Sequence, residues 1–248
     1  MSGYKSINFA LCLSVLLSAL ACTSSPVVNQ VGTVVRDTIT DVPCCVYLPS
    51  DYAKRAEKEV FPVLYLQHGM WGNENDWNEK GNLLGIMDSL LKRGEVEEMV
   101  IIMPDNCPSK PTYEEEKDNA TNGFWENHFA ELMSEAESRY SISSDPSHRA
   151  IAGLSIGGYH TMMVSSVLDG QFAYVGMFSA ATFVHRAPTD PKVFWIGIGN
   201  EDFLYESLRD YRQWLDASHI EYTYYESTGG HTWDNWQDYL VRFLIKIF

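Results

Sequence analysis

The chain has few basic residues and no concentrated basic segment. Of its 248 residues, 18 are Lys or Arg and 33 are Asp or Glu, which gives a formal net charge of -15 at pH 7. A protein that binds nucleic acid needs clustered positive charge to neutralise phosphates. Because the Lys and Arg residues are scattered, the composition argues against a nucleic-acid partner.

Cysteine is also scarce. The chain has five cysteines, and two of them, Cys12 and Cys22, lie near the N-terminus. The remaining three are Cys44, Cys45 and Cys107, an adjacent pair and a single residue, which give no disulfide framework. No spacing of His and Cys is typical of a metal site. We therefore expect a protein without a metal ion or cofactor.

A hydrophobic run long enough to span a membrane is absent as well. The apolar stretch at residues 7–21 follows Lys5 and is shorter than a transmembrane helix, as in an export signal. It ends in the small residues of the segment SALAC at 18–22, and polar residues follow. This pattern resembles the lipobox of bacterial lipoproteins, in which the cysteine is lipidated, although Ala19 stands where leucine is usual.

We therefore expect a signal peptide at residues 1–21, a tether at 22–30 and a folded domain at 31–248. The resemblance implies a lipid on Cys22 and a domain held outside the cytoplasm, in the periplasm or at the cell surface. Membrane contact would occur only through this anchor. The alternative is an ordinary secretory signal cut near Ala21, which would release a secreted protein.

The remainder of the chain alternates between strand and helix patterns. Short apolar runs without alternation indicate strands buried on both faces, and segments with helical periodicity separate them. Neither an internal repeat nor a linker interrupts this order. It predicts one α/β domain with a mainly parallel central sheet and helices on both faces. The expected later strands lie at 63–67, 99–103, 150–154, 174–178, 193–198 and 220–226, and the later helices at 83–93, 125–140, 204–217 and 235–247.

The segment RAIAGLSIGGYHTMM, residues 149–163, contains G-x-S-x-G centred on Ser155. In a strand–turn–helix context, Gly153 and Gly157 leave room for a sharp turn that exposes the serine. The unpaired N–H groups of the following helix favour negative charge near it. The pattern predicts Ser155 as a nucleophile, against the structural alternative of a Gly/Ser-rich turn before a buried helix.

Functional side chains in α/β sheets gather at the carboxyl ends of strands. Three expected strand ends carry Ser155, Asp202 and His231, in the chain order of an α/β-hydrolase triad. A neutral imidazole can remove the serine proton, and a carboxylate can hold its other nitrogen. From the residues alone, Glu201 and, more distantly, Asp105 compete with Asp202 for the role of the acid.

An early strand ends in the glycine-punctuated segment HGMWG, residues 68–72. An oxyanion hole combines the N–H after the nucleophile with one from such a loop. We therefore expect the N–H of Ile156 to act with that of Met70, or with that of Trp71. His68 itself is expected to be structural.

With these residues identified, the chain resembles the esterase D family and, within it, carbohydrate esterase family one. The resemblance implies an α/β-hydrolase fold with Ser155 as nucleophile, Asp202 as acid and His231 as base. Ile156 departs from it, since the family often has methionine there, and the acidic loop at 107–123 has no match. The matching segments are PVLYLQHG (62–69), ENDW (74–77), MPDN (103–106), RAIAGLSIGG (149–158), FAYVGMFSA (172–180), GNEDF (199–203) and GGHTWDNW (229–236).

The resemblance implies a serine carboxylic ester hydrolase that acts on acylated plant polysaccharide fragments, with feruloyl ahead of acetyl. An acetyl xylan esterase, another acyl-ester hydrolase of the family, or acyl transfer to a sugar are alternatives. A carbohydrate-binding lipoprotein without activity is the alternative of another class, and the intact triad argues against it. Aromatic residues near expected strand ends are candidates to line the acyl or sugar site, with burial in the core as the alternative for each of them. They are Trp71, Trp77, Tyr113, Phe124 and Trp236.

The lipid anchor is testable by the substitution Cys22→Ser. If Cys22 is lipidated, the variant moves from the membrane fraction to the soluble fraction without loss of activity, because the fold begins after the tether. Fractionation followed by mass spectrometry of the mature N-terminus measures this. A wild-type protein that is already soluble, with an unmodified first residue, would show the secretory alternative to be correct.

Overall fold

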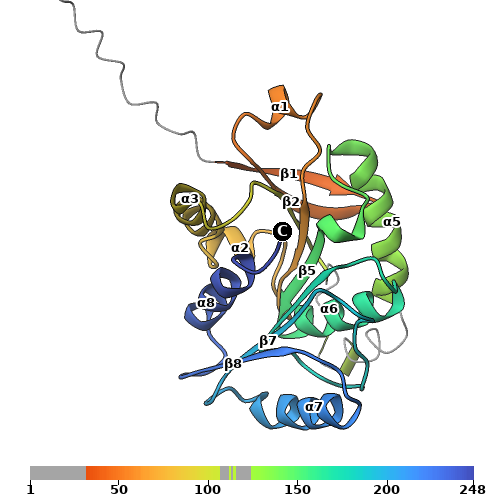
Figure 1. Ribbon diagram of the computed structural model, residues 1–248, viewed down its shortest axis with the longest axis vertical. Coiled ribbons are helices and arrows are strands. Elements are labelled where there is room, and N and C mark those ends of the chain that lie inside the picture. The colour runs from red at the N-terminus through yellow and green to blue at the C-terminus, as the bar shows by residue number, and fades with distance from the viewer. Residues whose placement is uncertain (1–31, 107–111, 113, 116–123) are drawn as a thin grey trace, which may run out of the picture.

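The computed structural model describes residues 32–106, 112, 114–115 and 124–248 (Figure 1). The expected signal peptide, the tether with Cys22, and most of the 107–123 loop, including Tyr113, lie outside the described residues. Among the helices of the described residues, none is long and apolar enough to cross a bilayer.

The described residues form an eight-stranded sheet in the order β1-β2-β4-β3-β5-β6-β7-β8. Strands β1 and β2 pair antiparallel, as do β2 and β4, and every other neighbouring pair is parallel. This confirms the predicted α/β fold with a mainly parallel sheet. The strands are β1 (Thr33–Ile39), β2 (Val42–Leu48), β3 (Val63–Gln67), β4 (Val100–Pro104), β5 (Arg149–Leu154), β6 (Tyr174–Phe178), β7 (Val193–Gly199) and β8 (Thr223–Ser227).

Helices cover both faces of the sheet, as predicted (Figure 1). Helices α2, α3 and α8 pack on one face, and α5, α6 and α7 pack on the other, each face with its own buried apolar cluster. The central strands are buried on both sides, which explains their unbroken apolar sequences. The helices are α1 (Tyr52–Arg55), α2 (Asp76–Glu79), α3 (Leu83–Arg93), α5 (Phe124–Arg139), α6 (Ile156–Val167), α7 (Tyr205–Ala217) and α8 (Trp233–Leu244).

The boundaries differ from the predicted ones at the C-terminal end of the chain. Strand β8 begins at Thr223, three residues after the expected start, because the N–H of Ile220 closes the end of α7 by donating to Leu215 O at 3.0 Å. Helix α8 begins at Trp233, ahead of the expected Asn235, and ends at Leu244. Helix α2 was not predicted, since four residues are too few to show a period.

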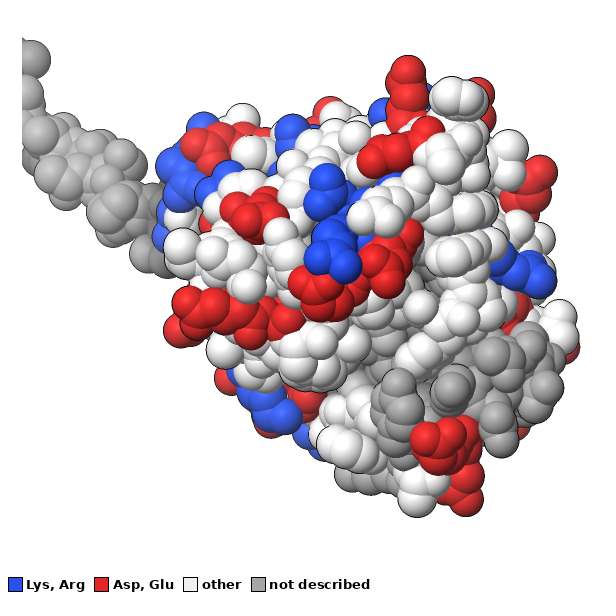
Figure 2. Space-filling view, turned by 90° about the horizontal axis from the view of Figure 1, so that it is seen from below, with Lys and Arg blue, Asp and Glu red and all other residues white. Residues whose placement is uncertain are grey.

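Acidic and basic side chains are mixed on the surface. Figure 2 shows one face, where Lys and Arg side chains lie in small groups beside Asp and Glu side chains. The described residues form several ion pairs at helical spacing, such as Lys92 with Asp88 at 2.7 Å and Arg242 with Asp238 at 2.7 Å. Such exposed pairs contribute little to stability. The fold therefore depends mainly on its two apolar clusters.

The parallel strands bring their carboxyl ends to one edge of the sheet. The segments that follow β3, β5, β7 and β8 contain, in that order, the HGMWG loop, Ser155, Asp202 and His231. The sheet topology thus brings together positions as far apart in the sequence as His68 and His231. This edge is where the predicted site must lie.

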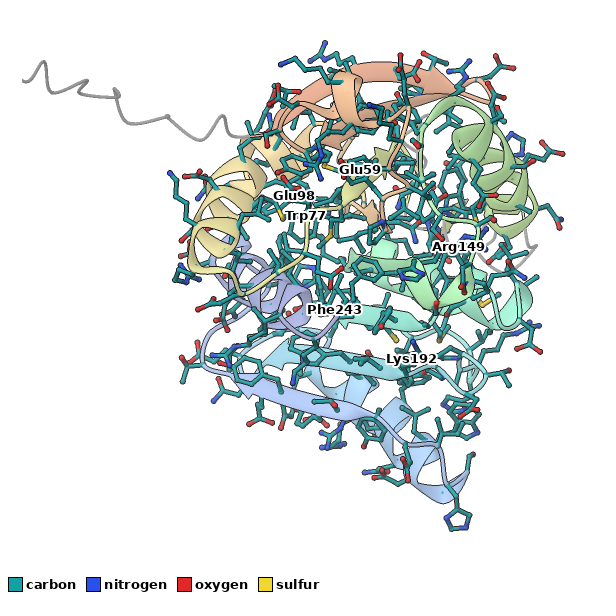
Figure 3. All side chains as sticks on the ribbon, turned by 45° about the horizontal axis from the view of Figure 1, so that its top comes forward. Glu59, Trp77, Glu98, Arg149, Lys192 and Phe243 are labelled. Atoms are coloured by element: carbon teal, nitrogen blue, oxygen red, sulfur yellow. The ribbon has the colours of Figure 1, made fainter. Side chains whose placement is uncertain are left out.

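Phe243 tests the dependence of the fold on the α8 cluster. Its side chain, labelled in Figure 3, is fully buried and packs edge-on against Phe178 with ring centroids 5.9 Å apart. We expect Phe243→Ala to cost about 3–5 kcal/mol through lost burial and a residual cavity. Thermal unfolding should show a drop in Tm of roughly 10 °C.

A matched control lies two residues further along the chain. Ile245 is 49% exposed, so Ile245→Ala should change stability by no more than about 0.5 kcal/mol. Equal losses in the two variants would contradict the assignment of Phe243 to the core.

Candidate active site

Ser155 lies at the sharp turn between β5 and α6. Its backbone has φ 56° and ψ -118°, a combination that is strained for a residue with a side chain. The turn requires Gly157, because a Cβ at that position would overlap the carbonyl oxygen of His68, and Gly153, where a Cβ would overlap the backbone of Gly157. The G-x-S-x-G segment therefore forms the strand–turn–helix that its sequence predicts.

Backbone hydrogen bonds hold this strained turn in place. The N–H of Ser155 donates to Phe178 O at 2.9 Å, and the carbonyl of Ser155 accepts from Ala181 N at 3.0 Å and from Tyr159 N at 3.2 Å. Strand β6 and the first turn of α6 thus fix the serine from two sides. Its side chain is left at the wall of a cavity of about 710 Å³.

His231 lies on the wall of the same cavity and is bonded to Asp202. Its Nδ1 is 3.0 Å from Oδ1 and 2.9 Å from Oδ2 of that carboxylate. A carboxylate only accepts hydrogen bonds, so Nδ1 holds the proton, and Nε2 is the ring nitrogen able to accept one from a hydroxyl. Glu201, by contrast, has an exposed side chain. Asp105 lies against His68, 3.2 Å from its Nε2, so Asp202 is the carboxylate that partners His231.

The surroundings of Asp202 favour its ionised form. Burial alone would raise the pKa of this carboxyl, but hydrogen bonds from His231 and from the N–H of Leu204, at 2.9 Å, outweigh burial and hold the pKa below its usual range. A carboxylate that stays ionised keeps the imidazole in one tautomer and can stabilise an imidazolium.

Aromatic rings fix the orientation of the histidine. The ring of Trp236 meets that of His231 at 90° with centroids 4.8 Å apart, and the ring of Phe203 lies 4.5 Å away at 52°. Asn235 ties the preceding loop by donating to Gly230 O at 2.8 Å. The imidazole side chain is left only 17% exposed.

The HGMWG loop lines the cavity next to the serine. Gly72 N donates to Gly69 O at 3.1 Å to close a tight turn, and Trp71 takes the left-handed conformation with φ 60°. Both predicted oxyanion positions, Met70 in this loop and Ile156 at the start of α6, lie on the cavity wall. These two segments, with Trp71 as the alternative position in the loop, therefore border the space next to Ser155, where the N–H donors of an oxyanion hole are expected.

A buried polar network around His68 holds the start of the HGMWG loop in place. His68 is 1% exposed, and its Nδ1 lies 2.6 Å from Gly69 O. The N–H of Asn106 donates to His68 Nε2 at 3.2 Å, and the side-chain amide of Asn106 donates to His68 O at 3.3 Å. The structural role expected for His68 agrees with these contacts, and Asn106 is a supporting residue that the sequence did not reveal.

The aromatic residues proposed as substrate contacts divide into two groups. Trp71, which is 63% exposed, and Trp236, which is 7% exposed, line the cavity. Trp77, labelled in Figure 3, does not, because it is 1% exposed and its indole N–H donates to Gln67 O at 3.0 Å. It is a core residue, which corrects the expectation. Phe124 begins α5, and its side chain lies outside the described structure.

Other apolar residues on the cavity wall were missed. Several of them lie close to predicted catalytic residues in the sequence, since Phe203 and Leu204 follow Asp202 and Trp233 follows His231 by two positions. Phe183 has no such signal, because it lies in the irregular segment between β6 and β7. The cavity is mainly apolar, and the missed apolar residues on its wall are Leu154, Ala181, Phe183, Phe203, Leu204 and Trp233.

No cluster suited to a metal ion occurs in the part of the chain that the structure describes: no three His, Cys, Asp or Glu side chains are grouped for it. The chemistry open to the described residues is that of a serine hydroxyl, an imidazole paired with a carboxylate, and backbone N–H donors. That set serves acyl transfer through a covalent serine intermediate.

Comparison with known proteins agrees with this chemistry. A family model described as "Putative esterase" matches residues 37–247. An endo-1,4-beta-xylanase/feruloyl esterase from Xylanibacter ruminicola is 30% identical over 162 residues, which are 63% of this chain and 22% of that protein. An acetyl esterase from Caldicellulosiruptor saccharolyticus is 23% identical over 235 residues, 77% of this chain and 85% of that protein. The chain therefore spans about a fifth of the first of these relatives.

Solved structures show the same fold. A ferulic acid esterase from Anaeromyces mucronatus, in complex with ferulic acid, superposes with a TM-score of 0.77 at 24% identity. The match covers 88% of this chain and 92% of that one. At this coverage, the shared fold extends over most of both chains.

The pairing of His231 with Asp202 leads to a test of the acid. Asp202→Asn should lower kcat on the order of 10⁴-fold, because an amide can donate to Nδ1 and so favours the wrong tautomer. Glu201→Gln is the matched control and should change kcat little, since its side chain is exposed. Steady-state kinetics on p-nitrophenyl acetate measure both, and a reversed order of effects would assign the acid to Glu201.

Proposed function

The chain belongs to this esterase family, carbohydrate esterase family one, and from that membership we propose that it is a serine esterase that releases feruloyl groups from plant polysaccharide fragments. One observation carries the proposal: Ser155, His231, which is paired with Asp202, and residues 69–72 of the HGMWG loop all border a single apolar cavity. Each supplies one part of the chemistry of ester hydrolysis.

In the acylation step, the Ser155 hydroxyl gives its proton to His231 Nε2 while its oxygen attacks the ester carbonyl carbon. The N–H groups of Ile156 and Met70 stabilise the resulting oxyanion, each donor being worth on the order of 3 kcal/mol. The imidazolium then returns the proton to the alcohol oxygen as the carbon–oxygen bond breaks. The alcohol leaves and the acyl group stays on Ser155.

In the deacylation step, His231 takes a proton from water, whose oxygen attacks the acyl-enzyme. The proton returns to Ser155 as the acid product departs. Asp202 remains ionised throughout, as its lowered pKa favours. No cofactor takes part in these steps.

The size and lining of the cavity support an aromatic acyl group. Its volume of about 710 Å³ lies within the range of sites for drug-sized ligands, and an acetyl group would fill only a small part of it. Trp71, Trp233 and Trp236 provide flat apolar walls. The relative from Xylanibacter ruminicola is named as a feruloyl esterase, which is consistent with this choice.

Acetyl ester hydrolysis is the second candidate. It is favoured by the similarity to the acetyl esterase, which extends over 85% of that protein. The catalytic steps would be the same, and only the fit of the acyl group would differ.

We also propose that the enzyme is exported and held at a membrane surface through a lipid on Cys22. The support is the short apolar segment at residues 7–21, which stops at a cysteine and is followed by a polar tether. An esterase held outside the cytoplasm would meet polysaccharide fragments that do not enter the cell.

A substitution and a substrate panel together test the function. Ser155→Ala should lower turnover by a factor on the order of 10⁶ while the protein stays folded, because the attacking oxygen is gone. Methyl ferulate and acetylated xylan, compared with the wild-type enzyme, then separate the two acyl groups.

A folded Ser155→Ala variant within tenfold of the parent would overturn the serine mechanism. Preference for acetylated xylan over methyl ferulate would replace the feruloyl assignment with the acetyl one. Formation of a new ester when a sugar acceptor is added would indicate acyl transfer in place of hydrolysis.

A further inference from the structure

Phe203 is the most exposed large apolar side chain on the described surface. It is 75% exposed, and Trp71 follows among the cavity residues at 63%. A single exposed apolar residue needs no explanation, but both of these residues border the cavity that holds Ser155. Large rings held in water at the mouth of an active site indicate a surface that a ligand covers.

The backbone around Phe203 holds its ring in a defined place. The residue before it, Asp202, donates its N–H to Gly199 O at 3.1 Å, and its carbonyl accepts from Tyr205 N at 2.9 Å. The carboxylate of Asp202 accepts the N–H of Leu204 at 2.9 Å, so the turn closes around Phe203. The turn therefore fixes the direction of the Cα–Cβ bond of Phe203, and the ring is presented by the same turn that holds the acid.

Phe203 contacts the histidine on its outer side. The centroids of the two rings are 4.5 Å apart, while the buried Trp236 meets the histidine at 4.8 Å. Since Phe203 is exposed and Trp236 is not, Phe203 covers the side of the His231 ring that faces the solvent.

The proposed function, on which this step rests, indicates which part of the ester lies next to His231. His231 gives its proton to the departing alcohol oxygen, so the alcohol must lie against the imidazole. The oxyanion loop follows β3, whereas Phe203 follows β7, on the other side of the serine strand β5 in the sheet. The ring next to His231 therefore borders the alcohol part of the ester, away from the side that holds the carbonyl oxygen.

We propose that Phe203 is the platform on which the sugar ring of the leaving alcohol stacks. A pyranose or furanose presents a face of C–H groups that packs against an aromatic ring, and its hydroxyls stay in water. An exposed ring suits an alcohol that continues outward as an oligosaccharide. Phe203 thus selects esters of carbohydrates over esters of small alcohols, whatever acyl group the cavity accepts.

The test uses two ferulate esters that differ only in the alcohol: methyl ferulate and a ferulate ester of a xylan-derived oligosaccharide. The readout is the ratio of kcat/KM for the sugar ester to kcat/KM for the methyl ester. Changes at His231 that slow the chemistry affect both esters and cancel in the ratio. We expect Phe203→Ala to lower the ratio about tenfold, mainly through the KM of the sugar ester.

Two further variants separate stacking from shielding of the histidine. Phe203→Leu keeps an apolar cover over His231 without a flat ring, so the ratio should fall as it does for alanine. Phe203→Tyr keeps the ring and should hold the ratio within twofold of wild type. Val60, which is 67% exposed and does not line the cavity, gives the matched control: Val60→Ala should leave the ratio unchanged.

The proposal is overturned if the ratio is the same in Phe203→Ala as in wild type, even if both rates fall, because Phe203 would then only position His231. It is also overturned if leucine preserves the ratio. Failure of the feruloyl assignment looks different: the wild type would hydrolyse neither ferulate ester, while still cleaving p-nitrophenyl acetate. In that case the same ratio, measured with ethyl acetate and acetylated xylo-oligosaccharide, tests Phe203 independently.

Discussion

The strained backbone of Ser155 is the constraint on which the rest of the site depends. A residue with φ 56° at the end of a strand stays there only if its surroundings over-determine it. Three backbone hydrogen bonds from β6, the β6 loop and α6 do this, and two glycines allow the helix to begin directly against the strand. The same close approach brings the start of α6 against the carbonyl of His68. One turn therefore exposes the nucleophile and also sets the distance to the oxyanion loop.

The histidine is held by a different combination of forces. It comes from the end of β8, an edge strand whose residues are mostly half-exposed, so the sheet alone would not fix it. Charge and packing do so instead: the ionised Asp202 takes its Nδ1–H, while Trp236 and Phe203 enclose its ring. Because Asp202 and Phe203 are adjacent in one turn after β7, the histidine receives its charge partner and its outer cover from the same short segment.

The parts of the molecule that follow local rules could be predicted from the sequence. Apolar runs predicted the buried strands, and the flanking glycines predicted the serine turn. Both features depend on residues that are neighbours along the chain. The role of Trp77 could not be predicted in the same way, since its burial under the strand ends depends on a helix of four residues, α2. Phe203 was not predicted because its exposure to solvent is set by the folded surface. In the sequence, the GNEDF segment indicated only the neighbouring acid, Asp202.

Substrate choice in this fold is expected to depend on the loops, because proteins named for different acyl groups are similar to the same chain. These are an endo-1,4-beta-xylanase/feruloyl esterase, 30% identical over 162 residues, and an acetyl esterase, 23% identical over 235 residues. Apart from Leu154 at the end of β5 and the serine turn that follows it, the cavity wall is assembled from segments after β3, β6, β7 and β8, which lie outside the sheet. The exposed wall residues, Trp71 and Phe203, belong to neither apolar cluster, so they can change without disturbing the packing that stabilises the domain. Specificity for the acyl group and for the alcohol can therefore vary independently, since the walls next to Ser155 and next to His231 belong to different loops.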